Sequence, residues 1–410
     1  MNQHDMQTES GEDKARVLDP SGGANQVRVR AHNERLILSL VRRHAGLSKA
    51  EIARRSGLSA QTTSVIMRQL ERDGLLTRGE PVRGKVGQPS VPMKLDPDGV
   101  YSFGLKIGRR SADLLLMDFI GRVRGELHQV YNYPHPGQIA EFVRDGVTEL
   151  AGKLNSAQRS KIAGLGIATP FELWNWAEEI GVDPASMESW RDVDLASVIS
   201  DIVPFPVFLQ NDATAACGAE LVFGRGPEFT DFVYFFVGTF IGGGIVLNHS
   251  LYSGRSGNAG SFGAMPVAGI SFPPGKLIDH ASIVVLERML EEAGKDPSPL
   301  WLDPDGWNDL GPSLDEWITQ TAKALAIAIV SSCSVIDFQA AIIDGGFPEP
   351  VRERLVAEVG RQIEDIDTRG IRLPKICAGS IGTRSRAVGG ASLPLFARYL
   401  IDENVLFKEA

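Results

Sequence analysis

The segment from residue 48 to residue 72 constrains the fold most strongly, because it pairs two short helical patterns around a glycine turn. Ser48 is suited to cap the first helix, and Gly57 marks the turn that follows it. Ser59 is suited to cap the second helix. The predicted core side of this second helix consists of Val65, Ile66 and Leu70. Two helices joined in this way are typical of a helix-turn-helix, whose second helix enters the DNA major groove.

The residues on either side of this segment predict a winged form of the helix-turn-helix. Residues 33–44 place apolar side chains on one helical face, which predicts a first helix. Residues 75–78 and 91–95 are typical of two short strands, and the loop between them is rich in glycine, proline and basic residues. We therefore expect a winged helix-turn-helix domain over residues 28–97.

Polar side chains of the second helix and the loop are the candidate DNA contacts. Gln and Arg are the residue types whose geometry favours bidentate contacts to adenine and guanine, although such side chains can also simply solvate a helix. Two cations of the loop suit a narrow minor groove, but an ordinary flexible linker explains them nearly as well. The predicted DNA-binding residues are Ser48, Ser59, Gln61, Thr62, Thr63, Ser64, Arg68, Arg83 and Lys85.

Charge is distributed unevenly between this domain and the rest of the chain. Residues 28–94 contain fourteen Lys and Arg against five Asp and Glu, a balance of +9. The whole chain of 410 residues carries −9, so the remainder carries −18. A basic module on an acidic body is typical of a DNA-binding domain joined to a regulatory domain. The alternative is a solvated basic face that has no nucleic-acid partner.

The remaining composition predicts a cytoplasmic protein of two or three domains. Residues 1–27 are polar and lack the apolar core of a signal peptide, and we expect them to form a disordered tail. The three cysteines lie far apart, which predicts neither a zinc site nor a disulfide framework. The apolar run 231–247 contains three consecutive glycines, which fit two buried strands better than a membrane span.

From residue 101 onward, groups of strands followed by helices occur twice. The first group comprises predicted strands at residues 101–107, 111–117, 122–130, 162–167 and 207–209 and helices at residues 138–154 and 213–223. The second group comprises predicted strands at residues 232–237, 245–247 and 340–343 and a helix at residues 322–335. This repeat predicts an α/β fold in two lobes, the actin-like ATPase (ribonuclease H-like) fold. The predicted limits are residues 98–215 with a C-terminal helix at 391–410 for lobe 1, and residues 216–390 for lobe 2.

Seven sequence motifs follow one another along the chain. They are GLSAQTTSVIMRQLERDGLL with GQP, GLKIGRRSADLLLMDFIGRV, GLGIATP, FLQNDATAACGAELVFG, FVGTFIGGGIVLNHSLYSGRSGNAGSFG, IIDGGF and IGTRSRAVGGA. Their order resembles that of the ROK (repressor, open reading frame, kinase) family, specifically its xylose-repressor-like branch. Any one motif is a weak signal, whereas seven in the family's order are a strong one. The resemblance covers about residues 30–400 and implies a sugar-kinase-like body behind the DNA-binding domain.

The resemblance implies two phosphate-binding loops, and the chain departs from both. Kinases of this fold carry Asp-x-Gly-Gly-Thr in the first loop, where the Asp holds magnesium-bound water, whereas residues 106–110 are Lys-Ile-Gly-Arg-Arg. The second loop is normally Gly-Thr-Gly, and Phe240 occupies its third position. Because phosphoryl transfer depends on positioning and on metal-assisted charge neutralisation, we expect no kinase activity and no cofactor.

The resemblance also implies a sugar-contacting pair in the body. In the kinases the residue matching Asp212 is the general base for a sugar hydroxyl, and the residue matching Asn211 bonds neighbouring hydroxyls. In a chain without kinase activity this pair remains suited to bind a polyol. The alternative is that Asp212 only caps a helix that begins at Ala213.

The family's sugar-binding signature, Ala-Gly-Glu-x-Gly-His, is altered in this chain. It falls on residues 259–264, where Ser261 replaces the Glu and Ala264 replaces the His that binds sugar and often zinc. His280 stands alone, so we expect no metal site. The predicted effector-binding residues are Asn211, Asp212, Asn258 and Ser261.

These observations lead to three hypotheses about function. The leading one is a sequence-specific transcriptional regulator, a repressor of carbohydrate-metabolism genes, that binds a double-stranded DNA operator as a homodimer or higher homo-oligomer. A sugar or polyol effector would close the lobes and release the DNA. One alternative is an active sugar kinase that carries a DNA-binding module. The other is a regulator that needs no ligand.

Overall fold

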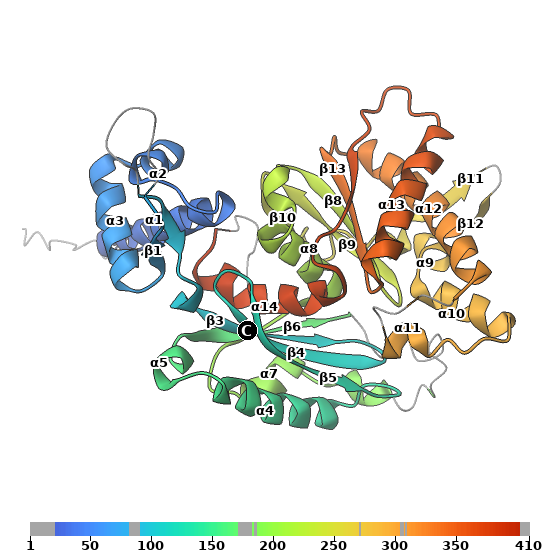
Figure 1. The fold of residues 1–410 in the computed structure, drawn as a ribbon, viewed down its shortest axis with the longest axis horizontal. Coiled ribbons are helices and arrows are strands. Elements are labelled where there is room, and N and C mark those ends of the chain that lie inside the picture. The colour runs from blue at the N-terminus through green and yellow to red at the C-terminus, as the bar shows by residue number, and fades with distance from the viewer. Residues whose placement is uncertain are drawn as a thin grey trace, which may run out of the picture.

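The computed structural model describes residues 21–81, 91–170, 183, 187–269, 272–303, 307 and 310–401. In this part of the chain a small helical head, shown in blue, lies against a larger body of two lobes (Figure 1). Each lobe is built on one five-stranded sheet. The predicted fold class, a winged helix-turn-helix followed by a two-lobed actin-like fold, is confirmed.

The head contains three helices and a two-stranded antiparallel sheet. Its elements are α1 (Ser21–Arg43), α2 (Lys49–Ser56), α3 (Ala60–Arg72), β1 (Leu76–Arg78) and β2 (Met93–Leu95). Helix α1 begins at Ser21, so residues 21–27 are helical and do not belong to the tail predicted for residues 1–27. Val27 and Val29 are both exposed on this helix. No apolar face therefore marks its first turns, which explains why the pattern from residue 33 onward predicted too late a start.

Local capping explains why the two helices of the motif begin and end where they do. Ser48 Oγ accepts a hydrogen bond from the backbone N–H of Glu51, and the Glu51 carboxylate accepts one from the backbone N–H of Ser48. Gly57 ends α2 with φ of 70°, a left-handed conformation that costs glycine little. Ser59 Oγ accepts a hydrogen bond from the N–H of Thr62. Both predicted N-caps are confirmed.

Lobe 1 has the strand order β5-β4-β3-β6-β7. The strands are β3 (Tyr101–Ile107), β4 (Ser111–Asp118), β5 (Val123–Val130), β6 (Ile162–Thr169) and β7 (Val207–Asn211). The first three form an antiparallel meander, and the last two run parallel to β3. Helices α4 (Pro136–Gly152) and α7 (Leu195–Ser200) cover one face, with the short α5 (Ser156–Arg159) before β6 (Figure 1).

Lobe 2 repeats this arrangement with the strand order β10-β9-β8-β13-β14. The strands are β8 (Phe232–Val237), β9 (Ile241–Leu247), β10 (Ser250–Tyr252), β13 (Ala340–Gly345) and β14 (Lys375–Ala378). The run 231–247 thus forms two buried strands, as predicted. The outer layer holds α9 (Leu277–His280), α10 (Ile283–Glu292), α11 (Pro299–Leu302), α12 (Pro312–Cys333) and α13 (Glu349–Glu364), beside the hairpin β11 (Pro266–Gly269) and β12 (Phe272–Lys276).

Two helices lie between the sheets, α8 (Asp212–Phe223) and α14 (Ser385–Arg398) (Figure 1). They pack closely because small residues face each other: a Cβ at Gly389 would lie 2.1 Å from the carbonyl oxygen of Ala215. The predicted lobe boundaries at residues 215/216 and 390/391 fall inside these two helices. One-turn 3-10 helices complete the fold at Pro97–Gly99, Glu188–Trp190, Gly226–Glu228, Phe262–Ala264 and Gly382–Arg384.

The head and the body share one hydrophobic core. Residues of α1 such as Ile37 and Val41 belong to the same buried cluster as Phe119 of lobe 1 and Phe396 of α14. Arg42 anchors this contact, because it donates a hydrogen bond to the Phe119 carbonyl oxygen. Burial lowers the pKa of Arg42 to about 9, so its guanidinium is charged at neutral pH.

Candidate DNA-binding and effector-binding sites

The outer face of α3 carries side chains spaced to lie on one stripe. Gln61, Val65, Arg68 and Arg72 are exposed at intervals of three or four residues, while Ile66, Met67 and Leu70 form the buried side. Val65 is 50% exposed, so its prediction as a core residue is wrong. At 100° per residue Val65 lies almost opposite the buried side, and Met67 takes the predicted place in the core.

Thr63 is also placed differently from its prediction. Its side chain is 1% exposed and packs within the head, so it cannot reach DNA, and Thr63 is removed from the predicted contacts. The sequence pattern suggested it only because its neighbours are polar. Its buried position follows from the spacing to Ile66, Met67 and Leu70, which turns residue 63 inward.

The other predicted DNA contacts of the motif lie on α3 or cap the N-termini of α2 and α3. The Ser59 and Thr62 hydroxyls are 2.9 Å apart, and Arg68 Nε donates to the Ser64 carbonyl oxygen over 3.1 Å. The Ser48 hydroxyl donates to the Glu51 carboxylate over 2.7 Å. Arg83 and Lys85 lie outside the described residues. A DNA-binding role for these residues stays a prediction.

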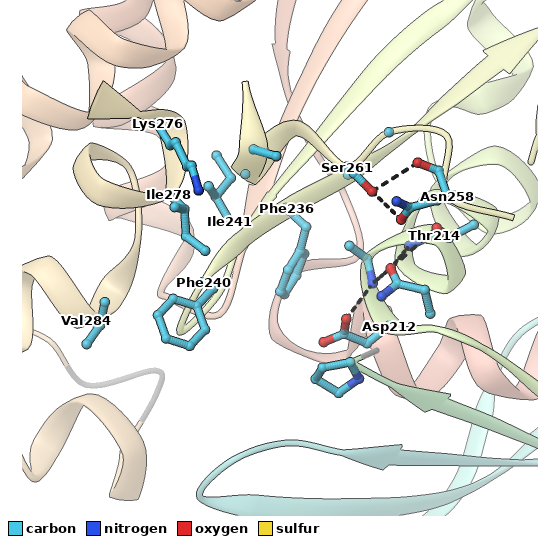
Figure 2. Close-up of a pocket in the computed structure, with 18 of the residues that line it drawn as sticks. Asp212, Thr214, Phe236, Phe240, Ile241, Asn258, Ser261, Lys276, Ile278 and Val284 are labelled. Atoms are coloured by element: carbon cyan, nitrogen blue, oxygen red, sulfur yellow. Dashed lines mark hydrogen bonds between the residues drawn. The ribbon is translucent and has the colours of Figure 1, made fainter. Parts of the chain in front are cut away.

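A cavity of about 730 Å³ opens between the lobes, and all four predicted effector-binding residues line it. Asn211 and Asp212 come from the junction of β7 and α8, and Asn258 and Ser261 come from the loop after β10. Figure 2 shows the labelled members Asp212, Asn258 and Ser261 on one side of this space. Segments about 46 residues apart in the chain therefore meet at one polar end of the cavity.

Asn211 caps α8, whereas Asp212 pairs with a cation. Asn211 caps α8, because its Oδ1 accepts hydrogen bonds from the backbone N–H groups of Ala213 and Thr214. The alternative in which Asp212 is the cap residue is wrong, although Asp212 Oδ1 also accepts from Ala213 N. The other carboxylate oxygen, Oδ2, lies 3.4 Å from Arg386 Nη1. The Asp212 carboxylate is thus held by a cation from α14.

Asn258 and Ser261 form a hydrogen-bonded polar pair in the lining of the same cavity. The Ser261 hydroxyl donates to the backbone carbonyl and to the side-chain oxygen of Asn258 (Figure 2). Both residues are exposed. Their amide and hydroxyl groups supply both donors and acceptors, which suits contacts with hydroxyl groups.

The first loop of lobe 1 is filled by its own charges. Lys106 Nζ lies 2.9 Å from Asp113 Oδ2 and donates to Ser111 Oγ over 2.7 Å. Burial lowers the pKa of Lys106, although Asp113 opposes this. A Cβ at Gly108 would meet the Lys106 side chain at 2.8 Å. The Lys106 ammonium group therefore lies beside the loop backbone and binds to side chains of the protein itself.

The two loops also contact each other across the lobes. The guanidinium carbon of Arg109, in lobe 1, lies 3.8 Å from the ring centroid of Phe240, in lobe 2. Arg110 Nη2 lies 3.7 Å from Glu287 Oε1 on α10, and burial raises the pKa of Glu287. We call this pair of contacts the interlobe clasp. It joins the two loops through side chains of the protein itself, beside a cavity of about 370 Å³ that both loops line.

The far end of the cavity has a different character, which the sequence analysis missed. Figure 2 shows Phe240, Ile278 and Val284 grouped away from Asp212, with Lys276 above them. Arg288 also lines the cavity. Apart from Phe240, which the second loop motif contains, no motif marked these residues, since they come from β12, α9 and α10. The signal that could have found them is the apolar run at residues 283–286, which continues directly into α10.

In the described part of the chain, no group of three or more His, Cys, Asp or Glu side chains is arranged to hold a metal ion. His280 is buried, and burial lowers its pKa. The three cysteines are buried, and none of them forms a disulfide with another described residue. Among the described residues, no helix combines the length and the apolar character that a membrane span requires.

Comparison with known proteins finds similar families for both the head and the body. Residues 102–281 match the model of the ROK family, and residues 30–77 match the winged helix-turn-helix DNA-binding model. The chain is 27% identical over 244 residues to the xylose repressor of Bacillus spizizenii, covering 60% of this chain and 62% of that protein. It is 23% identical over 314 residues to the DNA-binding transcriptional dual regulator NagC of Escherichia coli, covering 75% of each chain.

Among solved structures, a ROK family transcriptional regulator described as a homologue of the E. coli MLC protein has a similar fold. The TM-score is 0.65 at 19% identity, covering 90% of this chain and 97% of that one. At this identity the likeness concerns the fold. The two matching family models show a ROK family domain at residues 102–281, preceded by a winged helix-turn-helix DNA-binding domain at residues 30–77.

Proposed function

We propose that the chain is a sequence-specific transcriptional regulator, a repressor of carbohydrate-metabolism genes, whose kinase-like body binds a sugar or polyol. The observation that carries this proposal is that the domain with the candidate DNA-binding helix and the domain with the candidate effector cavity share one hydrophobic core. An exposed recognition face on α3 belongs to a head that shares its hydrophobic core with the body. The polar end of the interlobe cavity lies in that body.

The repressors among the relatives support this function. The xylose repressor and NagC are both named as regulators, and they match 60% and 75% of this chain. The basic head supports DNA as the partner, because cations attract the phosphate backbone independently of sequence. We further propose a homodimer, since two recognition helices one DNA turn apart bind a two-fold operator.

We also propose that the body no longer acts as a kinase. The Lys106–Asp113 ion pair and the interlobe clasp support this, because the first loop carries cations that bind within the protein where the kinases carry the carboxylate that holds magnesium-bound water. Calorimetry with Mg-ATP tests it. We expect no heat of binding, whereas micromolar affinity would favour the alternative of an active sugar kinase with a DNA-binding module.

The test of DNA binding is a gel-shift titration with the region upstream of the chain's own gene, at several salt concentrations. We expect sequence-selective binding that weakens steeply with salt. Arg68→Ala and Gln61→Ala should weaken the specific complex, and Arg361→Ala, an exposed arginine on the body helix α13, is the matched control. The absence of selective binding by the wild-type protein would contradict the proposal.

The test of effector binding is a thermal-shift screen with sugars and polyols. A stabilising ligand whose effect disappears in Asp212→Ala, and is reduced in Ser261→Ala, would support the polar end as its site. If no carbohydrate shifts the unfolding temperature while DNA binding persists, the ligand-independent regulator becomes the better description.

A further inference from the structure

We propose that the far end of the interlobe cavity is a second subsite, so that the effector is an amphipathic glycoside rather than a free sugar. Its hydroxylated ring would lie at Asp212 and Asn258. Its aglycone would be an apolar group that bears an anionic substituent, a carboxylate or a phosphate. This inference rests on the proposed function, since it names the class of molecule that the same cavity binds.

The first argument is size. The cavity of about 730 Å³ falls in the range of roughly 300–1,000 Å³ that is typical of sites for drug-sized molecules. A single sugar ring is much smaller than such a molecule. A ring placed against Asn211 and Asp212 would therefore leave the far end of the cavity open.

The second argument is the chemistry of the far end. We call it the apolar subsite, and its walls are Phe240, Ile241, Ile278, Val284 and Val285. In Figure 2, Phe240, Ile278 and Val284 surround one space, and the labelled polar side chains Asp212, Thr214 and Asn258 lie away from it. Hydroxyl groups of a polyol would find few partners there. An apolar group would be removed from water, which stabilises its binding in proportion to the apolar area buried.

The third argument is charge. Lys276, Arg288 and Asp279 line the cavity, with Lys276 beside Ile278 in Figure 2 and Arg288 one helical turn after Val284 on α10. The Asp279 carboxylate accepts a hydrogen bond from the backbone N–H of Lys276 over 2.9 Å, so it is already used in capping α9. The guanidinium of Arg109 lies on the ring of Phe240 at the same end. The cations exceed the anions around the apolar walls, which favours an anionic substituent on the apolar group.

The experiment compares matched series of ligands by calorimetry on the full chain. For each of glucose, xylose and galactose, the series contains the free sugar, the methyl glycoside, the phenyl glycoside and three substituted phenyl glycosides. The substituents are 4-carboxy, 4-phosphate and 4-aminomethyl, which are two anions and a cation. For the sugar that binds, we expect the phenyl glycoside to bind about tenfold more tightly than the methyl glycoside. An anionic substituent should tighten binding further, and the cationic one should weaken it.

Variants separate the two ends of the cavity. Ile278→Ser should reduce the gain of phenyl over methyl glycoside while leaving the affinity for the methyl glycoside unchanged. Arg288→Gln should reduce only the gain from the anionic substituent, and Arg288→Glu should reverse the preference in favour of the aminomethyl compound. Arg361→Gln, on the distant helix α13, is the matched control and should leave every affinity unchanged.

Each outcome has one meaning. If the aryl glycosides bind no better than the methyl glycosides, the inference is overturned, while sugar binding at Asp212 and DNA binding by the head both stand. Equal affinity for the anionic and cationic compounds overturns the anionic substituent alone. If no compound binds, the inference fails together with the effector role of the body, and the gel shift still decides DNA binding independently.

Discussion

Val65 places two methyl groups on the outer face of α3, between the polar side chains of Gln61 and Arg68. An exposed valine gains nothing from the core of the head. In a DNA complex it would meet the floor of the major groove, where the C5-methyl group of thymine is the apolar feature. Val65 is therefore suited to read thymine beside the hydrogen bonds made by its polar neighbours.

We expect Val65→Ala to weaken specific DNA binding about fivefold, which corresponds to ~1 kcal/mol of lost methyl–methyl contact. Replacing the contacted thymine by deoxyuridine, which lacks the methyl group, should weaken the wild-type complex equally. The two changes together should cost no more than either alone. Val335→Ala, at an 82%-exposed position on the body, is the control. Additive effects would contradict a direct contact.

Thr63 has the opposite environment, because its hydroxyl is buried and has no hydrogen-bond partner. Burying an unbonded hydroxyl is unfavourable, and valine has nearly the same shape. We expect Thr63→Val to raise the free energy of unfolding by about 1 kcal/mol, measured by urea denaturation, and to leave DNA affinity unchanged. A loss of DNA affinity without a change in stability would show that Thr63 contacts DNA after all.

At the scale of elements, α8 connects the cavity to the head. Its N-terminus is capped by Asn211 at the polar end of the cavity. At its C-terminal end the ring of Phe223 lies 4.7 Å from the guanidinium carbon of Arg42, a residue of α1. Since α8 is buried along most of its length, we propose that it carries a shift from one end to the other. This gives a physical route from ligand binding to the orientation of the recognition helix.

We expect Arg42→Ala to lower the free energy of unfolding by about 2–4 kcal/mol, because it removes two aromatic contacts and leaves the Phe119 carbonyl oxygen unbonded. Calorimetry should then resolve a separate, earlier transition for the head. Arg28→Ala, an exposed arginine on the same helix, is the control and should change little. A single transition at the wild-type temperature in Arg42→Ala would show that Arg42 does not hold the two parts together.

At the scale of the whole molecule, the interlobe clasp holds the lobes in contact. We expect Arg109→Gln and Phe240→Ala to be coupled by about 0.5–2 kcal/mol in a double-mutant cycle of unfolding free energies, because each removes the same cation–π contact. Hydrogen exchange should rise at residues 108–111 and 238–241 in both variants. Strict additivity, with exchange unchanged, would mean that the contact does not hold the lobes.

Much of the fold follows from patterns that act over a few residues. The capping box at Ser48, the glycine turn at Gly57 and the cap at Ser59 determine the helix-turn-helix locally. The predicted strand runs at residues 101–107 and 232–237 match β3 and β8. Such patterns depend on hydrogen bonds and side-chain periodicity within one element, so they can be recognised without knowledge of the rest of the chain.

The sequence by itself therefore determined the order of the domains and the two N-caps of the head. Only the tertiary structure decided that Arg386 holds Asp212, that Arg109 lies on Phe240, and that an apolar subsite adjoins the polar one. The physical reason is distance along the chain. The first two contacts join residues 174 and 131 positions apart, and the packing of α14, α8 and the two sheets brings them together. The two ends of the cavity come from separate elements between β7 and α10.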